Sequence, residues 1–208
     1  MYFDGKEVYI INPDGADNGA VSVSLSDIAT KAQVNNTIPV DVTATYSSPV
    51  SPPPYMVGMV EIELDKETGA VKILDYQAVV DCGIPVNPNL ARVQTEGGIG
   101  QGIGMALYEN VTYNADGKIA ENDFMQYKIP TRQDVGHINV EFETSYEPSG
   151  PFGVKSIGEI VINTPAPALA HAIYRATGVW HRTVPFTPEK ILMGMVDPNW
   201  HEKDLRVK

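Results

Sequence analysis

Apolar and polar residues alternate along residues 57–64, where Glu61 and Glu63 separate the apolar side chains. A period of two predicts a strand that buries one face. A second apolar run at residues 71–80 follows the turn sequence DKETG, so the two runs together predict an antiparallel hairpin. Two further strands are expected, at Lys6–Asn12 and Ile138–Phe142.

Capping residues and helical spacing predict the helices. Asn87 and Pro88 open a helical pattern that runs to Glu109. Thr164-Pro165 combines a capping residue with proline at the first helical position, and Gly178 ends that helix. Shorter helices are expected after Ser24 or Ser26 through Lys31, and from Thr187 through Met193. Hairpins and helices without a repeating strand–helix unit predict an α+β fold and not a doubly wound parallel sheet.

A proline-rich segment divides the chain. Residues 47–55 read SSPVSPPPY, with four prolines in nine residues, and predict an extended connection. We therefore expect an N-terminal segment at 1–50 and a main domain at 51–208.

Composition narrows the class of protein. The net charge of −11 is spread along the chain and argues against binding to nucleic acid. Cys82 is the single cysteine, so no intrachain disulfide is possible. The first residues lack a secretory signal, and no apolar run approaches the roughly 18 residues of a membrane helix, so a cytoplasmic protein that does not enter the membrane is expected.

Five glycines lie within residues 97–104, GGIGQGIG. The spacing does not match a dinucleotide-binding G-x-G-x-x-G, and no Gly-Lys-Ser/Thr follows as in a P-loop. Two interpretations remain. The glycines allow close packing of backbone against backbone, or they allow a ligand to approach, with Gln101 supplying an amide donor and acceptor.

A loop rich in glycine and proline leads to Glu159. Residues 147–159 read EPSGPFGVKSIGE, and Phe152, Val154 and Ile157 suggest that the loop packs inward. An apolar run at 160–162 follows, so we expect the Glu159 carboxylate to be partly desolvated, which suits a general base. Asp41 and Asp81 are isolated acids and are interpreted as solvated or turn-capping groups. The four histidines have no spacing that places two on one helix face, so a metal held by protein side chains is not expected.

Several spaced blocks together resemble one family. Residues 79–109 (VVDCGIPVNPNLARVQTEGGIGQGIGMALYE), 124–131 (FMQYKIPT) and 148–159 (PSGPFGVKSIGE) are similar to segments of the molybdenum hydroxylases. The TPAPALAHAIYRATG and VPFTPEKIL segments follow the same family order. The resemblance is to the C-terminal part of the large subunit of xanthine dehydrogenases and aldehyde oxidases, and it implies their C-terminal molybdopterin-binding domain as the fold.

The resemblance also implies a cofactor and a site. The family binds molybdenum through a pterin dithiolene, often as the cytosine dinucleotide, and no protein atom ligates the metal. Gln101 and Gly102 match positions that contact this cofactor, and Ile157 and Gly158 match positions that line the same site. Glu159 matches the catalytic base. Ile160 stands where the family usually has proline, and Ser156 stands where a small or apolar residue is common.

The implied function is hydroxylation of an N-heterocycle or an aldehyde with oxygen derived from water. Electrons would leave through iron–sulfur clusters and FAD on other subunits of an oligomer. The family's other cofactor-binding glycine loop and its substrate-clamping arginine do not occur here, so the remaining half of the molybdenum subunit is an expected partner. The isolated chain is expected to be inactive. The alternative is a non-catalytic fragment that retains the fold and a subunit interface.

Overall fold

The computed structural model describes residues 2–3, 5–10, 21–35, 43–197 and 200. The chain divides into two compact units, Met1–Ser47 and Ser48–Lys208. The division lies at the start of the proline-rich segment.

The first unit contains a small antiparallel sheet and one helix. Strands β1 (Tyr2–Phe3), β2 (Glu7–Ile10) and β3 (Val21–Ser24) pair in the order β1-β2-β3. The Ser24 hydroxyl accepts a hydrogen bond from the Asp27 N–H (3.0 Å) and caps α1 (Leu25–Val34). The strand expected at 6–12 is β2, and residues 11 and 12 lie outside the described residues.

The second unit has a three-stranded sheet in the order β4-β5-β6. Strands β4 (Tyr55–Leu64) and β5 (Val71–Asp81) form the expected antiparallel hairpin. Strand β6 (His137–Phe142) runs parallel to β5, because α2 (Pro88–Leu107) lies between them and returns the chain to the same end of the sheet. The predicted α+β class is confirmed. The hairpin pattern in the sequence did not predict the crossover connection through α2 that makes β6 parallel to β5.

The expected residues lie at the ends of the helices of this unit, but Thr164 makes no capping hydrogen bond, and its hydroxyl accepts one from the Tyr76 hydroxyl instead (2.9 Å). Asn87 Oδ1 accepts a hydrogen bond from the Leu90 N–H (3.1 Å) at the start of α2. Helix α3 (Pro165–Thr177) follows Thr164 and ends at Gly178, whose φ of 77° is the left-handed conformation that glycine favours. Helix α4 (Pro188–Val196) is capped by Thr187. None of the helices in the described part of the chain is long and apolar enough to cross a membrane.

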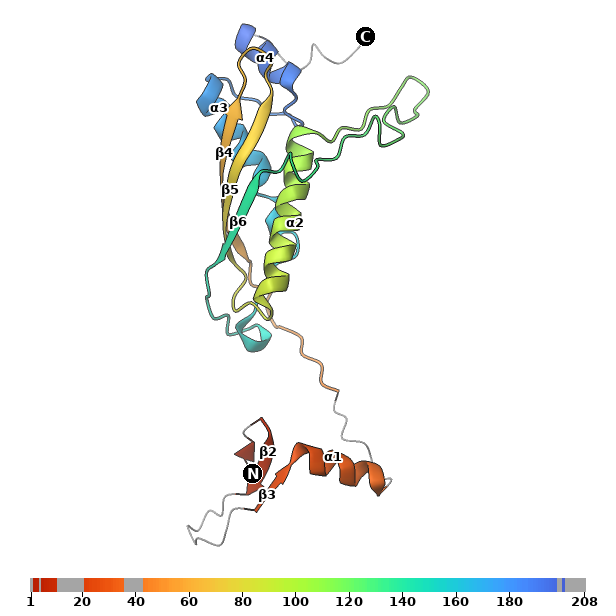
Figure 1. Cartoon of the computed structure of the whole chain (residues 1–208), viewed down its shortest axis with the longest axis vertical. Coiled ribbons are helices and arrows are strands. Elements are labelled where there is room, and N and C mark those ends of the chain that lie inside the picture. Colours follow the sequence, from red (N-terminus) through yellow and green to blue (C-terminus); the bar gives the residue numbers. More distant parts are fainter. Residues whose placement is uncertain (1, 4, 11–20, 36–42, 198–199, 201–208) are drawn as a thin grey trace. The chain divides into compact units, whose positions relative to one another are not determined.

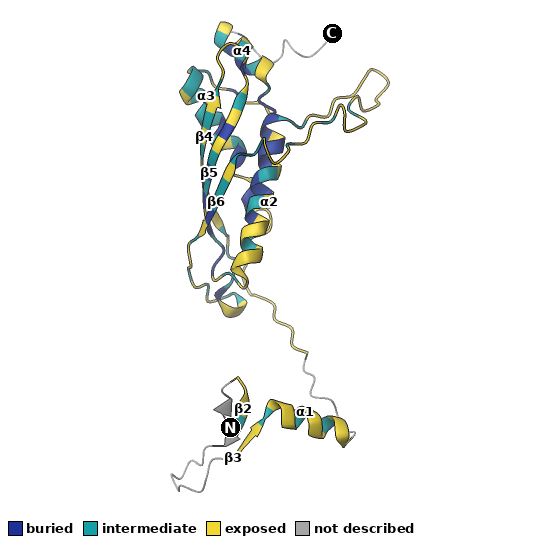
Figure 2. Cartoon of the chain, viewed as in Figure 1, coloured by how far each residue is buried: buried dark blue, intermediate teal, exposed yellow. Residues whose placement is uncertain are grey.

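Helices α2 and α3 pack on one face of the sheet and make the core. In Figure 1, α2 lies alongside the strands. The alternation in β4 places Val60 and Ile62 toward this core and leaves Val57 and Met59 exposed on the other face. Figure 2 shows the buried residues of α2 concentrated in its C-terminal half. The fully buried core includes side chains from β5, α2, β6 and α3: Ile73, Tyr76, Ala78, Val80, Ile99, Ile103, Val140, Leu169 and Ile173.

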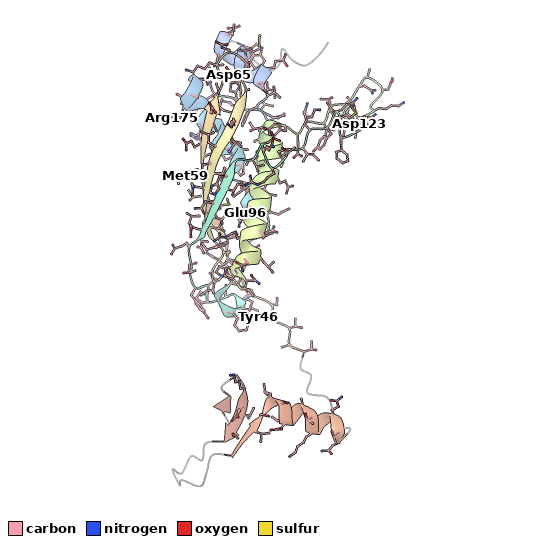
Figure 3. The ribbon with its side chains drawn as sticks, viewed as in Figure 1. Tyr46, Met59, Asp65, Glu96, Asp123 and Arg175 are labelled. Atoms are coloured by element: carbon pink, nitrogen blue, oxygen red, sulfur yellow. The ribbon has the colours of Figure 1, made fainter. Side chains whose placement is uncertain are left out.

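An arm joins α2 to β6 and projects from the rest of the unit (Figure 1). Asp123, labelled in Figure 3, lies in this arm and accepts hydrogen bonds from the Met125 and Gln126 N–H groups. Phe124 and Met125 are more than four-fifths exposed. The arm therefore adds little to the core of this unit.

The glycines of α2 divide by the face of the helix on which they lie. A Cβ at Gly98 would lie 2.1 Å from Val161 Cγ2, and one at Gly102 would lie 2.7 Å from Pro165 Cγ and 3.0 Å from the Ile162 carbonyl oxygen. Gly97 and Gly100 face open space. Close packing of η2 and Pro165 on the helix backbone therefore accounts for Gly98 and Gly102, which are four residues apart on one helix face, and does not account for Gly97 or Gly100.

We predict opposite effects of substitution at Gly102 and Gly97. Gly102→Val should lower the free energy of unfolding by about 1–3 kcal/mol, because the side chain would displace Pro165 and the Ile162 carbonyl. Gly97→Ala should raise it by about 0.5–1 kcal/mol, because alanine is the better helix former and has room. Denaturant unfolding measures both. Equal effects at the two positions would contradict this division of the helix faces.

Candidate functional site

The segment between β6 and α3 carries Glu159 and contains two short 3₁₀ turns. These are η1 (Pro151–Gly153) and η2 (Ile160–Ile162). Ile157 is half-buried against the core, as expected, but Phe152 is 89% exposed. The expectation that Phe152 packs inward is wrong, because it has a positive φ of 56° at a turn that directs its ring to solvent.

The middle of this segment pairs with the residues that follow β5. The Lys155 N–H donates to the Cys82 carbonyl (2.7 Å), and the Ile84 N–H donates to the Gly153 carbonyl (2.9 Å). Gly83 has a φ of 71°, and a Cβ there would lie 2.3 Å from the Gly153 carbonyl oxygen. Only glycine permits so close an approach, so residues 153–155 are held directly against the end of β5.

A partly buried ion pair secures the same contact. Lys155 Nζ lies 2.6 Å from Asp81 Oδ2, and the two side chains are 7% and 20% exposed. Asp81 Oδ1 also accepts hydrogen bonds from the Ser145 hydroxyl (2.6 Å) and the Gly83 N–H (3.0 Å). Asp81 was expected to be solvated or turn-capping. Asp81 does accept a hydrogen bond from the nearby Gly83 N–H. Its other two partners, Ser145 and Lys155, lie more than sixty residues away in the sequence, and no local pattern can indicate them.

These partners control the charge on Asp81. Burial alone would raise the pKa of the carboxyl group, but the hydrogen bonds from Lys155, Ser145 and Gly83, with the charge of Lys155, lower it to about 2. The carboxylate is therefore ionised at neutral pH and holds the loop through charge as well as hydrogen bonds.

Glu159 lies just beyond this anchored part of the loop. Its side chain is exposed, and its carbonyl accepts a hydrogen bond from the Ile162 N–H (3.1 Å) at the start of η2. The preceding carbonyl, that of Gly158, accepts a hydrogen bond from Gln94 Nε2 of α2 (2.8 Å). The expected partial desolvation of Glu159 is not found within this chain, because Val161 of η2 packs against α2 whereas Glu159 itself is exposed.

The expected cofactor-binding residues lie in different environments. Gln101 is exposed on α2 and lines a cavity of about 350 Å³ together with Thr131 and Arg132. Gly102 is buried beneath η2 and α3. Gly158 is exposed beside Glu159. Gln94 and Gln101 are seven residues apart, so they lie on one face of α2, two turns from each other.

The wall of the Gln101 cavity also carries an acid. Glu109 lines it and accepts a hydrogen bond from the Tyr127 hydroxyl (2.6 Å). Among the described residues, no three histidine, cysteine, aspartate or glutamate side chains form a group that could hold a metal ion. The chemical groups that this region offers a ligand are therefore carboxamide, hydroxyl, guanidinium and carboxylate.

Comparison with known proteins gives consistent matches. The family model of the molybdopterin cofactor-binding domain matches residues 3–136, which include residues of both units. The chain is 36% identical over 194 residues to a probable hypoxanthine oxidase, XdhD, of Escherichia coli K12, covering 91% of this chain and 20% of that protein. It is 35% identical over 142 residues to the putative xanthine dehydrogenase molybdenum-binding subunit XdhA of the same strain, covering 68% and 19%.

A solved structure agrees with these matches. Quinoline 2-oxidoreductase from Pseudomonas putida 86 aligns with a TM-score of 0.63 and 34% identity, over 66% of this chain and 18% of that one. The chain thus spans about a fifth of the length of the curated relatives it matches.

We predict that Asp81 makes the stability of the fold depend on pH. Its folded-state pKa of about 2 is below the unfolded value, so its ionised form favours folding. That contribution is fully present above about pH 5 and is lost as the pH falls through about 2. Between about pH 6 and pH 2, the original chain should lose about 1–2 kcal/mol more free energy of unfolding than Asp81→Asn, measured with denaturant.

Asp116→Asn is the matched control, since Asp116 is exposed in a hairpin turn of the arm. It should keep the original pH dependence. If Asp81→Asn also keeps it, the ion pair with Lys155 does not contribute to folding.

Proposed function

The chain belongs to the molybdopterin cofactor-binding family, as part of the molybdenum-binding subunit of the xanthine dehydrogenase and aldehyde oxidase class, and from this premise we propose that it forms one wall of a hydroxylase active site. The wall consists of the exposed face of α2 and the segment that ends at Glu159. The reaction is the hydroxylation of an N-heterocycle or an aldehyde with oxygen derived from water.

The residues of this chain fit a pterin cofactor through hydrogen bonding. Molybdopterin, or its cytosine dinucleotide form, supplies the redox metal and the oxygen-transfer chemistry when it is bound. Gln101 offers an exposed carboxamide on the wall of the 350 Å³ cavity, and Thr131 and Arg132 add donors there. The backbone of Gly102 is buried under Ile162 and Pro165. The role of Gly102 is therefore to allow this close packing of the helix that carries Gln101.

We assign to Glu159 the role of general base. The observation that carries this is an exposed carboxylate immediately after a backbone held by the Asp81–Lys155 ion pair and by Gln94. The oxygen of a general base has to lie within about 3 Å of the atom that carries the proton, so the site requires a fixed backbone and a free carboxylate. The rest of the subunit would cover Glu159 and remove water from it.

The remaining parts of the enzyme lie outside this chain. We propose that the other half of the molybdenum subunit completes the cofactor site and selects the substrate. Iron–sulfur and FAD subunits of the same oligomer would accept the electrons. The short coverage of the matched relatives and the name of one of them as a molybdenum-binding subunit support this division of labour.

Glu159→Gln tests the assigned base. In the assembled enzyme, glutamine keeps the shape of the side chain but cannot accept the proton, so turnover should fall by roughly 10²–10⁴-fold. Molybdenum content and KM should change little. Glu143→Gln, at an exposed position soon after β6, should retain turnover. Steady-state kinetics with an N-heterocyclic and an aldehyde substrate, beside metal analysis, would refute the role if Glu159→Gln turned over at the original rate.

We also expect the purified 208-residue chain by itself to contain no molybdenum and to have no hydroxylase activity. The reason is that only one wall of the proposed site lies on it. Elemental analysis after expression in cells that make the cofactor measures this. Stoichiometric molybdenum in the isolated chain would show that one wall is sufficient for binding.

A further inference from the structure

The side chain of Gln94, a residue of α2, bonds directly to the segment before Glu159. Its Nε2 donates to the Gly158 carbonyl oxygen at 2.8 Å across sixty-four residues of sequence. We propose that Gln94 is a positioning residue, whose carboxamide fixes the Gly158–Glu159 peptide and so sets where the Glu159 carboxylate lies.

This bond acts on a stretch of backbone with few other restraints. On either side of it, the Lys155 N–H donates to the Cys82 carbonyl and the Glu159 carbonyl accepts from the Ile162 N–H. Among the described residues, 156–158 make no hydrogen bond other than the one from Gln94. Around Gly158, a Cβ would meet only the Ser156 hydroxyl, at 4.0 Å. Glycine in open space has wide conformational freedom, so the direction of this peptide depends on Gln94.

The packing of α2 makes Gln94 a rigid point of reference. About one and two turns further along the helix, Gly98 and Gly102 receive η2 and the start of α3, and Thr95 is fully buried. Glu96, labelled on α2 in Figure 3, lies between Gln94 and Gly98 in sequence. The backbone that carries Gln94 is therefore continuous with the best-packed part of the helix.

The same helix links Glu159 to the proposed cofactor contact. Gln94 and Gln101 lie on one face about 10.5 Å apart along the axis, because seven residues rise 1.5 Å each. Helix α2 thus sets the spacing between the segment that carries Glu159 and the Gln101 carboxamide. This step rests on the proposed function, whereas the effect of Gln94 on the loop backbone does not.

The test uses Gln94→Leu and Gln94→Glu in the assembled enzyme that contains this chain. Both variants keep the length of the side chain and its helix propensity approximately, and both remove the N–H donor. Gln133→Leu is the matched control, because Gln133 is exposed in the residues just before β6. The measurements are amide hydrogen exchange of residues 156–160, kcat and KM separately, molybdenum content and the melting temperature.

We expect both Gln94 variants to exchange about 2- to 10-fold faster at residues 156–160, the range for loss of one neutral hydrogen bond. kcat should fall about ten-fold, with KM, metal content and melting temperature close to those of Gln133→Leu. Exchange and kcat equal to the control would overturn the proposal. So would a fall in kcat that only follows lost metal or a lowered melting temperature.

Failure of the proposed function would look different. If Glu159→Gln retained full turnover while both Gln94 variants still loosened residues 156–160, the base would be assigned wrongly but Gln94 would still position this peptide. If Glu159→Gln were inactive and the Gln94 variants left exchange unchanged, the base would stand and the positioning role would fail.

Discussion

The structure of the second unit depends on the close approach of η2 to α2. Gly98 and Gly102 present a helix face without side chains, so Val161 and the Ile162 carbonyl can lie against the helix backbone. Because α2 also packs on the sheet, this contact fixes the segment after Glu159 relative to the core. A helix face with larger residues would push η2 outward, and the start of α3 would move with it.

The segment before Glu159 is held by a different force. The Asp81–Lys155 ion pair is partly buried, and its carboxylate has three donors, so the desolvation of the charges is offset by hydrogen bonds. One anchor is thus electrostatic and the other is steric. Glu159 lies between the two, with its carboxylate exposed in this chain.

Helices α2 and α3 cover one face of the β4-β5-β6 sheet, and the other face carries exposed apolar side chains such as Val57 and Met59. The arm adds Phe124 and Met125 at exposed positions. Exposed apolar side chains that gather on one surface are typical of surfaces that other protein segments cover.

The sequence by itself determined the elements whose signals are local. Asn87 caps its helix, Pro165 and Gly178 mark the start and end of theirs as expected, and the alternation before Leu64 defined a strand with one buried face. Tertiary structure alone decided the parallel pairing of β6, the difference between Gly97 and Gly98, and the partnership of Asp81 with Lys155. The physical reason is range: caps and periodicity involve residues within one or two turns, whereas these three outcomes depend on which distant segments the crossover through α2 brings together.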